Sequence, residues 1–468
     1  MPFRIRWKNF RGFRDTGDIE FKPLTILIGP NNSGKSSLIQ PLLLMRQTLL
    51  SPPSSQPLVL RGDLVRAGDF KDLVTCGNTN LDISFSVDFH FHGQPQSKRG
   101  PVGSIPPGGV TCIFSWDSRQ MEMVLSKYVV VDTYNRILYQ RNRTQDGSYD
   151  LSSVRGFFKQ EDLSGRNSTD LKMRRKIRAA APEHFLFLGE QLFTDILTET
   201  IEDDSYPPPP MTVAKVRNYV AISEFAVSGL RDLLCLNISY LGPLRESPRR
   251  VYETSGQPPN DVGINGNRTP ELILNQFNRP ISGSSTLTKW LKHFDLPPVI
   301  KAQRLNDLTS AFSLIATTDD HGTEVNFADL GFGVSQLLPL IVQCLITSEG
   351  HSLITEQPEI HLNPKLQAGL ADLFVDVVQR KGSVIVETHS EHLLTRIRRL
   401  VAEGKISSGE VAIYYIEHDS DGSRVREVPM TKIGHVDAND WPEGFFDQGY
   451  REASGLAKAQ RALKSNES

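Results

Sequence analysis

The chain has 468 residues, which is long enough for two or three domains. Hydrophobic residues make up 38% and charged residues 23% of the sequence, and these fractions are ordinary for a globular protein. The net charge of −2 excludes a strong overall attraction to nucleic acids, so any binding of DNA would have to come from local basic patches.

The first predicted elements are short strands within residues 3–28. FRIRWKNF, IEF and LTILIG have the alternating or apolar pattern of strands, and a turn is expected at 11–18. The apolar run at 24–28 leads into a glycine-rich loop, and residues 36–50 carry the apolar stripe of a helix. The N-terminal region therefore predicts the order strand, loop, helix.

The middle of the chain changes character twice. Residues 81–150 contain several segments with period-two alternation, which predicts antiparallel β structure. Residues 168–200 and 213–236 have helical patterns and are separated by the stiff YPPPP at 206–210. Residues 287–295 predict another helix.

The last third returns to alternating strands and helices. Residues 328–346 predict a glycine-bearing loop that opens a long apolar helix, and residues 351–362 predict a buried strand that leads into a loop. Residues 381–394 repeat the order strand, loop, helix, and a further strand is expected at 411–419. Strands that alternate with helices indicate a largely parallel sheet in an α/β fold.

The loop after the apolar run at 24–28 fits the pattern G-x-x-x-x-G-K-[ST]. Its glycines let successive backbone N–H groups point into one concavity, which holds phosphate oxygens. Lys35 adds a positive charge beside the β- and γ-phosphates, Ser36 offers a hydroxyl to Mg²⁺, and the helix directs its positive end at the same anion. A chance glycine-rich turn is the alternative interpretation. The predicted nucleotide-binding residues are Gly29, Asn31, Asn32, Ser33, Gly34, Lys35, Ser36 and Ser37.

Two later strands deliver further polar residues. Residues 353–356 form a hydrophobic strand that ends in Glu356, as a Walker B element must in order to hold Mg²⁺ and its water shell. The apolar residues 384–386 are followed by Glu387, Thr388 and His389. A histidine at the C-terminal end of a parallel strand faces the crevice where such sheets bind nucleotides. The alternative for His389 is a structural or surface histidine.

Five segments, in this order, resemble those of SMC/RecF-like ABC ATPases: NFRGF, GPNNSGKSS, GFGVSQLLPL, TEQPEIHLNP and VETHSEHLL. The nearest resemblance is to stand-alone bacterial ATPases related to the OLD (overcoming lysogenisation defect) proteins. It covers roughly residues 1–75 and 320–400. YLGPLRESPRR at 240–250 and WPEGFFDQ at 441–448 are similar to segments of the same bacterial group, without an implied mechanism.

The resemblance implies a signature loop that contacts the γ-phosphate held by another subunit, so that ATP lies between two heads. A small residue, a hydroxyl and a helix N-terminus also make an anion site on physical grounds. The resemblance gives Glu356 the Mg²⁺ role and His389 the sensing of the γ-phosphate, and it starts the signature helix at Leu337. An ordinary glycine-rich helix start is the alternative for the loop. The implied loop residues are Gly331, Gly333, Ser335 and Gln336.

Gln357 departs from the ABC pattern, which places a catalytic glutamate directly after the Walker B acid. An amide cannot accept a proton as a base, although it can orient water. Three interpretations stay open: an engineered substitution that slows hydrolysis, a naturally slow ATPase, or a shifted catalytic role for Glu359 or His389. We therefore name Gln357, Glu359 and His389 as catalytic candidates and expect ATP binding with slow turnover.

OLD-type nucleases carry a metal-binding Toprim domain after the ATPase, and this sequence shows no acidic cluster of that kind. Asp419 and Asp421 stand in the turn-like segment HDSDGS, which explains them better than metal binding does. The effector that ATP would control is therefore expected to be a separate nuclease or toxin.

Compartment and partners follow from weaker signals. The sequence has no apolar run of about 18 residues and no apolar N-terminal segment, so no membrane span or secretory signal is expected. The cysteines form no CxxC pair, which indicates reduced thiols in the cytoplasm without a zinc site. Basic runs are candidate DNA contacts, with a solvated helix face as the alternative. They are Lys172, Arg174, Arg175, Lys176 and Arg178; Arg245, Arg249 and Arg250; and Arg396, Arg398 and Arg399.

The predicted fold is α/β: a P-loop ABC-type ATPase head with an antiparallel β lobe and a mainly helical insertion. The predicted domains are the N-terminal half of the head (1–75), the β lobe (76–165), the insertion (166–305), the C-terminal half of the head (306–430) and an extension (431–468).

The predicted function is an ATPase that requires ATP and Mg²⁺, forms a homodimer or a higher even-numbered oligomer around ATP, and gates an effector in bacterial anti-phage defence. The alternatives are a RecF-like DNA-binding maintenance ATPase and an ATP-stabilised scaffold with slow turnover. A transporter ATPase is disfavoured, because such heads rarely carry so long an insertion.

Overall fold

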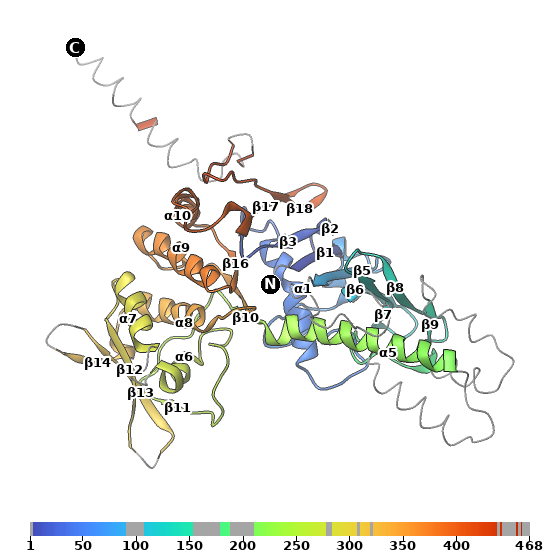
Figure 1. Cartoon of the computed structure of the whole chain (residues 1–468), viewed down its shortest axis with the longest axis horizontal. Helices are drawn as coiled ribbons and strands as arrows, with labels where there is room; N and C mark the ends of the chain where they lie inside the picture. Colours follow the sequence, from blue (N-terminus) through green and yellow to red (C-terminus); the bar gives the residue numbers. More distant parts are fainter. Residues whose placement is uncertain are drawn as a thin grey trace. The chain divides into compact units, whose positions relative to one another are not determined.

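The computed structural model describes residues 3–89, 107–152, 178–187, 210–277, 283–306, 309–318, 322–437, 440–441, 455–456 and 460. These residues form two compact units (Figure 1). The first unit comprises Met1–Phe21, Ser36–Ile238 and His418–Arg424, and the second comprises Lys22–Lys35, Ser239–Glu417 and Val425–Ser468.

An eight-stranded antiparallel sheet organises the first unit. Its order is β2-β1-β5-β6-β7-β8-β9, and β3 pairs with β1. The antiparallel structure predicted for 81–150 is thus confirmed for residues 81–89 and 107–150, and the rest of that segment lies outside the described residues. The strands are β1 (Phe3–Phe10), β2 (Phe13–Asp15), β3 (Ile19–Phe21), β5 (Ile83–Phe89), β6 (Pro107–Asp117), β7 (Glu122–Asp132), β8 (Ile137–Arg143) and β9 (Tyr149–Ser152).

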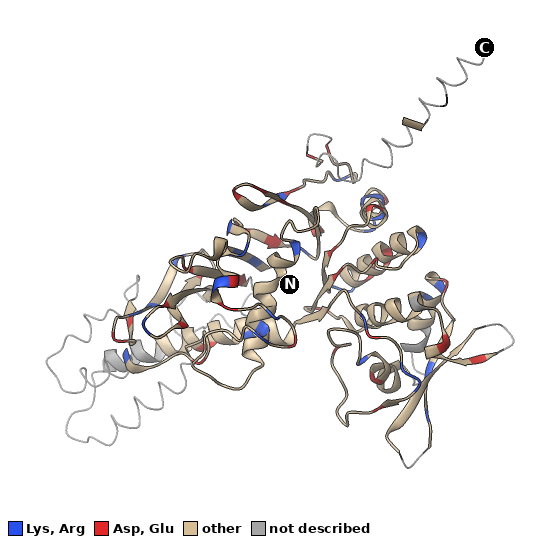
Figure 2. Cartoon of the chain, turned by 180° about the vertical axis from the view of Figure 1, so that it is seen from behind, with Lys and Arg blue, Asp and Glu red and all other residues tan. Residues whose placement is uncertain are grey.

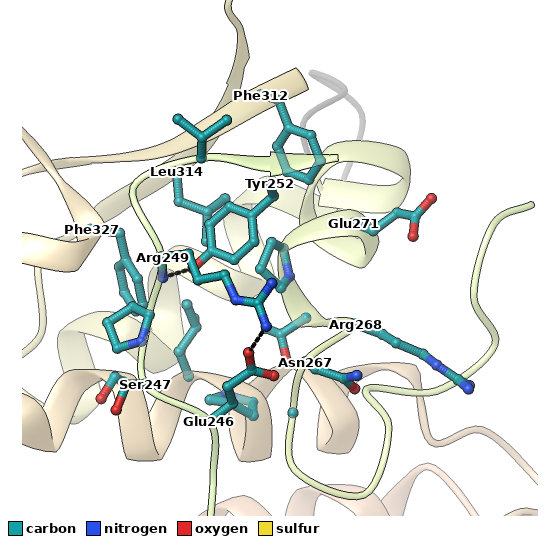
Figure 3. Close-up of a pocket in the computed structure, with 18 of the residues that line it drawn as sticks. Glu246, Ser247, Arg249, Tyr252, Asn267, Arg268, Glu271, Phe312, Leu314 and Phe327 are labelled. Atoms are coloured by element: carbon teal, nitrogen blue, oxygen red, sulfur yellow. Dashed lines mark hydrogen bonds and ion pairs between the residues drawn. The ribbon is translucent and has the colours of Figure 1, made fainter. Parts of the chain in front are cut away.

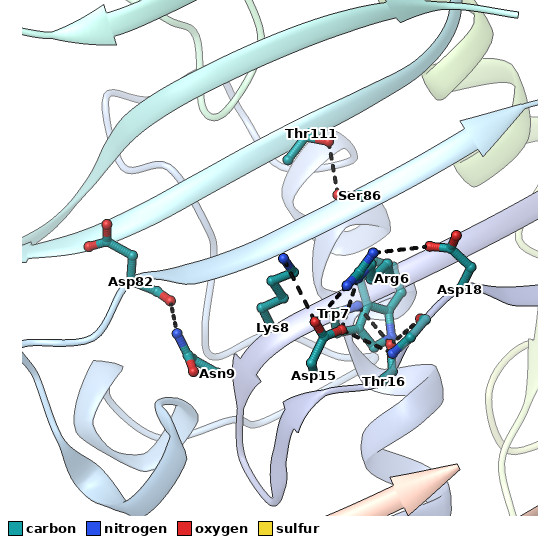
Figure 4. A network of polar contacts seen from close by, with 11 residues as sticks. Arg6, Trp7, Lys8, Asn9, Asp15, Thr16, Asp18, Asp82, Ser86 and Thr111 are labelled. Atoms are coloured by element: carbon teal, nitrogen blue, oxygen red, sulfur yellow. Dashed lines mark hydrogen bonds and ion pairs between the residues drawn. The ribbon is translucent and has the colours of Figure 1, made fainter. Parts of the chain in front are cut away.

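Aromatic side chains fill the core of this unit. β1 and β5 bury alternate residues, as strands with one covered face do. Trp7 is fully buried, and its indole N–H donates to the Leu38 carbonyl oxygen (2.8 Å) in helix α1 (Lys35–Leu49). Phe85 packs edge-on against Trp7. On the surface near Trp7, Arg6 pairs with Asp15 (Figure 4).

Helix α5 (Pro210–Arg231) packs on β5 and β6 and continues into a π-helical turn, η3 (Asp232–Leu236). This agrees with the helix predicted for 213–236. Most of the helical segment predicted for 168–200 lies outside the described residues. Within its described part, residues 178–179 are helical and residues 180–187 are not. Two further short elements of the unit are α2 (Phe70–Leu73) and η1 (Thr75–Gly77).

A six-stranded sheet organises the second unit, with the order β10-β15-β16-β4-β17-β18. The strands β15, β16, β4 and β17 run parallel, and every residue of β4 and β16 is buried. Strands that are buried along their whole length occur where both sheet faces are covered. The strands are β4 (Leu24–Ile28), β10 (Ile238–Leu241), β15 (Ser352–Glu356), β16 (Ser383–Glu387), β17 (Val411–Asp419) and β18 (Gly422–Glu427).

Helix α8 (Phe332–Ile346) precedes β15, and helices α9 (Pro364–Gln379) and α10 (Glu391–Ala402) follow β15 and β16. The helices predicted within 328–346 and 381–394 correspond to α8 and α10, whereas α9 was not predicted. Asn363 and Ser390 cap α9 and α10 by accepting the N–H groups of Leu366 and Leu393. Because short loops join β15 to α9 and β16 to α10, the strand ends and the helix starts lie at one edge of the sheet.

The second unit also holds a small antiparallel sheet with the order β11-β13-β12, in which β14 pairs with β13. The described part of the predicted insertion, 166–305, contains helices together with strands β10, β11 and β12. The predicted domain boundaries stay a prediction. The elements are β11 (Tyr252–Glu253), α6 (Thr269–Leu272), η4 (Ile273–Phe277), α7 (Gly283–His293), β12 (Val299–Arg304), β13 (Ala311–Thr317), β14 (Glu324–Asn326), η5 (Phe327–Asp329) and η6 (Ser408–Glu410).

The α/β class with an additional antiparallel sheet is confirmed. Within the described residues, no helix combines the length and the apolar character that a membrane crossing requires.

Candidate nucleotide-binding site

The predicted P-loop connects β4 to α1 in a tightly curled conformation. Gly29, Asn32 and Gly34 have φ angles of 152°, 62° and 106°, which side chains with a Cβ rarely adopt. A Cβ atom on Gly29 would lie 2.1 Å from the Ile416 carbonyl oxygen, so this position requires glycine. The curl is the backbone form that groups N–H donors into an anion-binding concavity.

Lys35 lies at the start of α1 and is almost fully buried. Its Nζ atom donates to the carbonyl oxygens of Gly29 (3.1 Å) and Pro30 (2.7 Å). Burial lowers the pKa of Lys35, and the carboxylates of Glu387 and Glu359 oppose that shift. The ammonium group is therefore held by the loop itself and is attracted by Glu387 at the end of β16 and by Glu359 in the turn after β15.

Strands β15 and β16 end side by side, and each ends in a glutamate. Glu356 at the end of β15 is in register with Glu387 at the end of β16. The Glu356 carboxylate accepts a hydrogen bond from the Tyr240 hydroxyl (2.9 Å), which comes from β10. The next residue, Gln357, has a φ of 45°, and its N–H donates to the Glu387 carbonyl oxygen (2.7 Å). Parallel strand ends thus bring together residues that are far apart in sequence.

The buried Glu359 and the partly buried His389 form a second pair in this cluster. The Glu359 carboxylate accepts the backbone N–H of His389 (2.6 Å). The other carboxylate oxygen and the His389 Nε2 atom are buried without a hydrogen-bond partner among the described residues. Burial raises the pKa of Glu359 and lowers the pKa of His389, and the Lys35 charge adds to the latter shift. A carboxylate with a raised pKa beside a neutral imidazole suits proton transfer near neutral pH.

Arg245 joins the cluster, although the sequence suggested it only as a member of a basic run. It follows β10, is 7% exposed, and none of its three guanidinium nitrogens has a hydrogen-bond partner among the described residues. Burial lowers the pKa of Arg245 to about 10, against the attraction of Glu359 and Tyr240. The similarity of the segment YLGPLRESPRR to a bacterial group pointed to the region of Tyr240 and Arg245. The local sequence pattern did not indicate what these two residues bind.

The predicted signature residues lie at the start of α8. The helix begins at Phe332 instead of the predicted Leu337, so Gly333, Ser335 and Gln336 belong to its first two turns. A Cβ atom on Gly331 would meet no atom within 4 Å, so the backbone here is open to an incoming group.

Ser335 is largely buried and lines a groove of about 740 Å³, much of whose lining is drawn in Figure 3. The groove combines charged residues such as Glu246 and Arg249 with aromatic ones such as Tyr252 and Phe312. The predicted signature helix therefore borders a cavity of the size that small ligands or inserted side chains use.

The candidate DNA-binding arginines are mostly paired with acids, and basic and acidic residues are interspersed over the chain (Figure 2). Lys172, Arg174, Arg175 and Lys176 lie outside the described residues. Arg398 donates to the Gly434 carbonyl oxygen. The ion pairs are Arg178 with Asp146 and Asp150, Arg249 with Glu246, Arg250 with Asp329, Arg396 with Asp372, and Arg399 with Glu403.

The family model described as "AAA domain, putative AbiEii toxin, Type IV TA system" matches residues 157–395, just over half of the chain. The chain belongs to this AAA family. A second model, described as "AAA ATPase domain", matches residues 4–177, which include the P-loop. A third, a family of unknown function, matches residues 406–454 of the AAA protein. The chain is thus an ATPase of the AAA type.

Other comparisons add little detail about this AAA ATPase. No curated protein matches it. Among solved structures, the Smc head domain with an extended coiled coil, bound to the C-terminal domain of ScpA, from Pyrococcus furiosus is 12% identical, covers 100% of both chains and has a TM-score of 0.37. The SMC head domain from Thermotoga maritima is 11% identical, covers 91% of this chain and 98% of its own, and also has a TM-score of 0.37.

Proposed function

We propose that this AAA ATPase binds Mg·ATP at the strand ends of its second unit. Buried polar atoms without hydrogen-bond partners occur in several places among the described residues, and the observation that carries the proposal is that several of them lie on the P-loop and on the segments that follow β10, β15 and β16. They are Ser33 Oγ, the Arg245 guanidinium, one Glu359 oxygen and His389 Nε2. Because unpaired buried polar groups are costly, their concentration around a P-loop fits a polar ligand with both donors and acceptors.

Each part of the cluster suits one part of Mg·ATP. The curled backbone at 29–34 and Lys35 would bind phosphate oxygens. Ser36 and Glu356 would hold Mg²⁺, which neutralises phosphate charge during hydrolysis. The hydrogen bond from Tyr240 fixes the orientation of the Glu356 carboxylate, as partners of metal ligands commonly do.

For hydrolysis we assign the role of base to Glu359. Gln357 holds the position of the usual glutamate, but its amide can only orient water. Glu359 is buried, has one unpaired oxygen and has a raised pKa, so its carboxylate accepts a proton more readily than an exposed one. His389 is then a neutral hydrogen-bonding group next to the reaction. Turnover is slow, because the base is displaced from the position directly after Glu356.

We further propose that two copies close around ATP, with the Gly331–Gln336 segment of one copy contacting the γ-phosphate of the other. The open backbone at Gly331 and the N-terminal end of α8 support this role. Ser335 lines the adjacent groove, and it would complete the contact with the γ-phosphate after a small opening of this groove. A homodimer, or an even-numbered oligomer built from dimers, follows from this arrangement.

The ATP-driven closure would gate a separate effector, a nuclease or a toxin, in bacterial anti-phage defence. The matching family is described by a putative AbiEii toxin of a type IV toxin–antitoxin system, which supports a setting of that kind. The test is to mix the purified protein with the product of a neighbouring gene and measure effector activity. Activity should require ATP and be lost in Lys35→Ala. Equal activity with and without ATP would contradict gating.

A further inference from the structure

Arg245 is the most unusual side chain of the cluster. It is 7% exposed, and its Nε, Nη1 and Nη2 atoms are buried without a partner among the described residues. A guanidinium group stays charged in proteins and offers five N–H donors in a planar fork. Burying that charge without a counter-group is costly, so the fold retains an arginine here against its own stability.

The nearest acid does not satisfy this arginine. Glu359 attracts Arg245 electrostatically, yet the two side chains form neither a hydrogen bond nor an ion pair, and one Glu359 oxygen is also unpartnered. A buried cation and a buried carboxylate that attract each other without a direct contact suit a third group that binds them. That group must accept hydrogen bonds from the guanidinium, and a phosphate is the common partner of such a fork.

The sheet order indicates which phosphate this is. The P-loop follows β4, whereas Arg245 follows β10, and β15 and β16 lie between these two strands. Strand β10 lies on the same side of β4 as β15 and β16, and the Glu359 carboxylate acts electrostatically on both Lys35 and Arg245. A nucleotide whose inner phosphates sit in the P-loop would therefore direct its terminal phosphate toward Glu359 and Arg245. Arg245 is thus placed for the end of the phosphate chain, beside the proposed base Glu359.

We propose that Arg245 binds the γ-phosphate and makes the site prefer ATP over ADP. This inference rests on the proposed function, because it needs a nucleotide in the P-loop. It assigns Arg245 a binding role that is distinct from the surface role of its neighbours Arg249 and Arg250, whose side chains are largely exposed and paired with acids.

The test compares Arg245→Met and Arg245→Lys with the wild type in the full chain. Dissociation constants for Mg·ATP and Mg·ADP are measured by calorimetry, and melting temperatures are recorded with and without nucleotide. Arg245→Met should weaken ATP binding about 10- to 100-fold and change ADP binding less than about twofold. Arg245→Lys should weaken ATP binding less, because it keeps the charge without the fork. Arg304→Met, an exposed arginine on β12, is the matched control and should change neither constant.

Stability separates binding from a structural role. Without nucleotide, Arg245→Met should melt at the same temperature as the wild type or higher, because an unpaired buried charge is removed. Equal loss of ATP and ADP affinity, or a lower melting temperature without nucleotide, would overturn the assignment. Wild-type protein that binds ATP while Arg245→Met binds it equally well would overturn it as well. Failure of the wild type to bind ATP would instead refute the nucleotide site itself.

Discussion

Two buried arginines, one in each unit, differ in their hydrogen bonding. In the first unit, Arg141 is fully buried, and its guanidinium donates to the Tyr219 hydroxyl (2.9 Å) and the Ala180 carbonyl oxygen (3.2 Å) and lies over the Phe187 ring. In the second unit, Arg245 is nearly as buried and has no hydrogen-bond partner among the described residues.

Two buried acids repeat the contrast. Asp132 in the first unit accepts N–H groups of Tyr134 and Arg136 and the Arg136 side chain, so both of its oxygens are used. Glu359 in the second unit leaves one oxygen unpartnered. Burial alone therefore does not mark a functional residue. Burial with unused hydrogen-bonding groups, gathered at parallel strand ends, is what distinguishes the candidate site.

The largest expected effect separates Glu359 from Gln357. Glu359→Gln should reduce ATP turnover about 100- to 10,000-fold, because it removes the proposed base, while ATP still binds. Gln357→Ala should reduce turnover much less. Both are measured as phosphate release under single-turnover conditions. Turnover that survives in Glu359→Gln and disappears in Gln357→Ala would show that Glu359 is not the base.

The second prediction concerns the paired arginine. Arg141→Met should lower the free energy of unfolding of the first unit by about 2–4 kcal/mol, because it leaves the Tyr219 hydroxyl and a carbonyl oxygen without their donor. Urea denaturation followed by tryptophan fluorescence measures this change. If Arg141→Met were as stable as the wild type, hydrogen-bond pairing would not explain the difference between Arg141 and Arg245.

A smaller effect is expected at the metal ligand. Tyr240→Phe removes the hydrogen bond to Glu356 and keeps the ring. It should therefore raise the Mg²⁺ concentration needed for half-maximal ATP binding about tenfold. A titration of ATP binding against Mg²⁺ shows the shift. Tyr252→Phe, in the groove away from this carboxylate, provides the comparison. An unchanged Mg²⁺ midpoint in Tyr240→Phe would remove Tyr240 from the site.

The smallest effect is a pH dependence of stability. The folded state raises the pKa of Glu359 above its ordinary value of 4.5, so it favours the protonated form. The corresponding stability is fully present below that ordinary value and is lost as pH rises through the raised pKa. Glu359→Gln should therefore gain in melting temperature relative to the wild type as pH increases over this window. If the difference in melting temperature did not vary with pH, the folded state would not raise the pKa of Glu359.

The sequence was most informative where chemistry and local pattern coincide. The P-loop, the strand ending in Glu356 and the strand before His389 were all predicted, because a glycine-rich turn or an apolar run ended in a charged or polar residue. The start of α8 was placed five residues too late, at Leu337 instead of Phe332, because Gly331 and Gly333 resembled a loop.

Tyr240 and Arg245 could not be assigned roles in the same way. Tyr240 and its partner Glu356 are separated by 116 positions, and they meet because β10 lies beside β15 in the sheet. Strand order is set by packing of the whole unit, so a local sequence pattern does not predict it. The burial that distinguishes Arg245 from Arg249 and Arg250 is likewise visible only after folding.

The central claim is that ATP held by the P-loop of one copy is completed by the Gly331–Gln336 segment of another. Light scattering on Glu359→Gln with and without Mg·ATP tests it most directly, because slow hydrolysis keeps the closed state populated. We predict that ATP doubles the mass from 52.3 kDa, and that adding Lys35→Ala or Ser335→Arg prevents the change. A mass that ATP does not alter, or a dimer that forms equally with Lys35→Ala, would contradict the account.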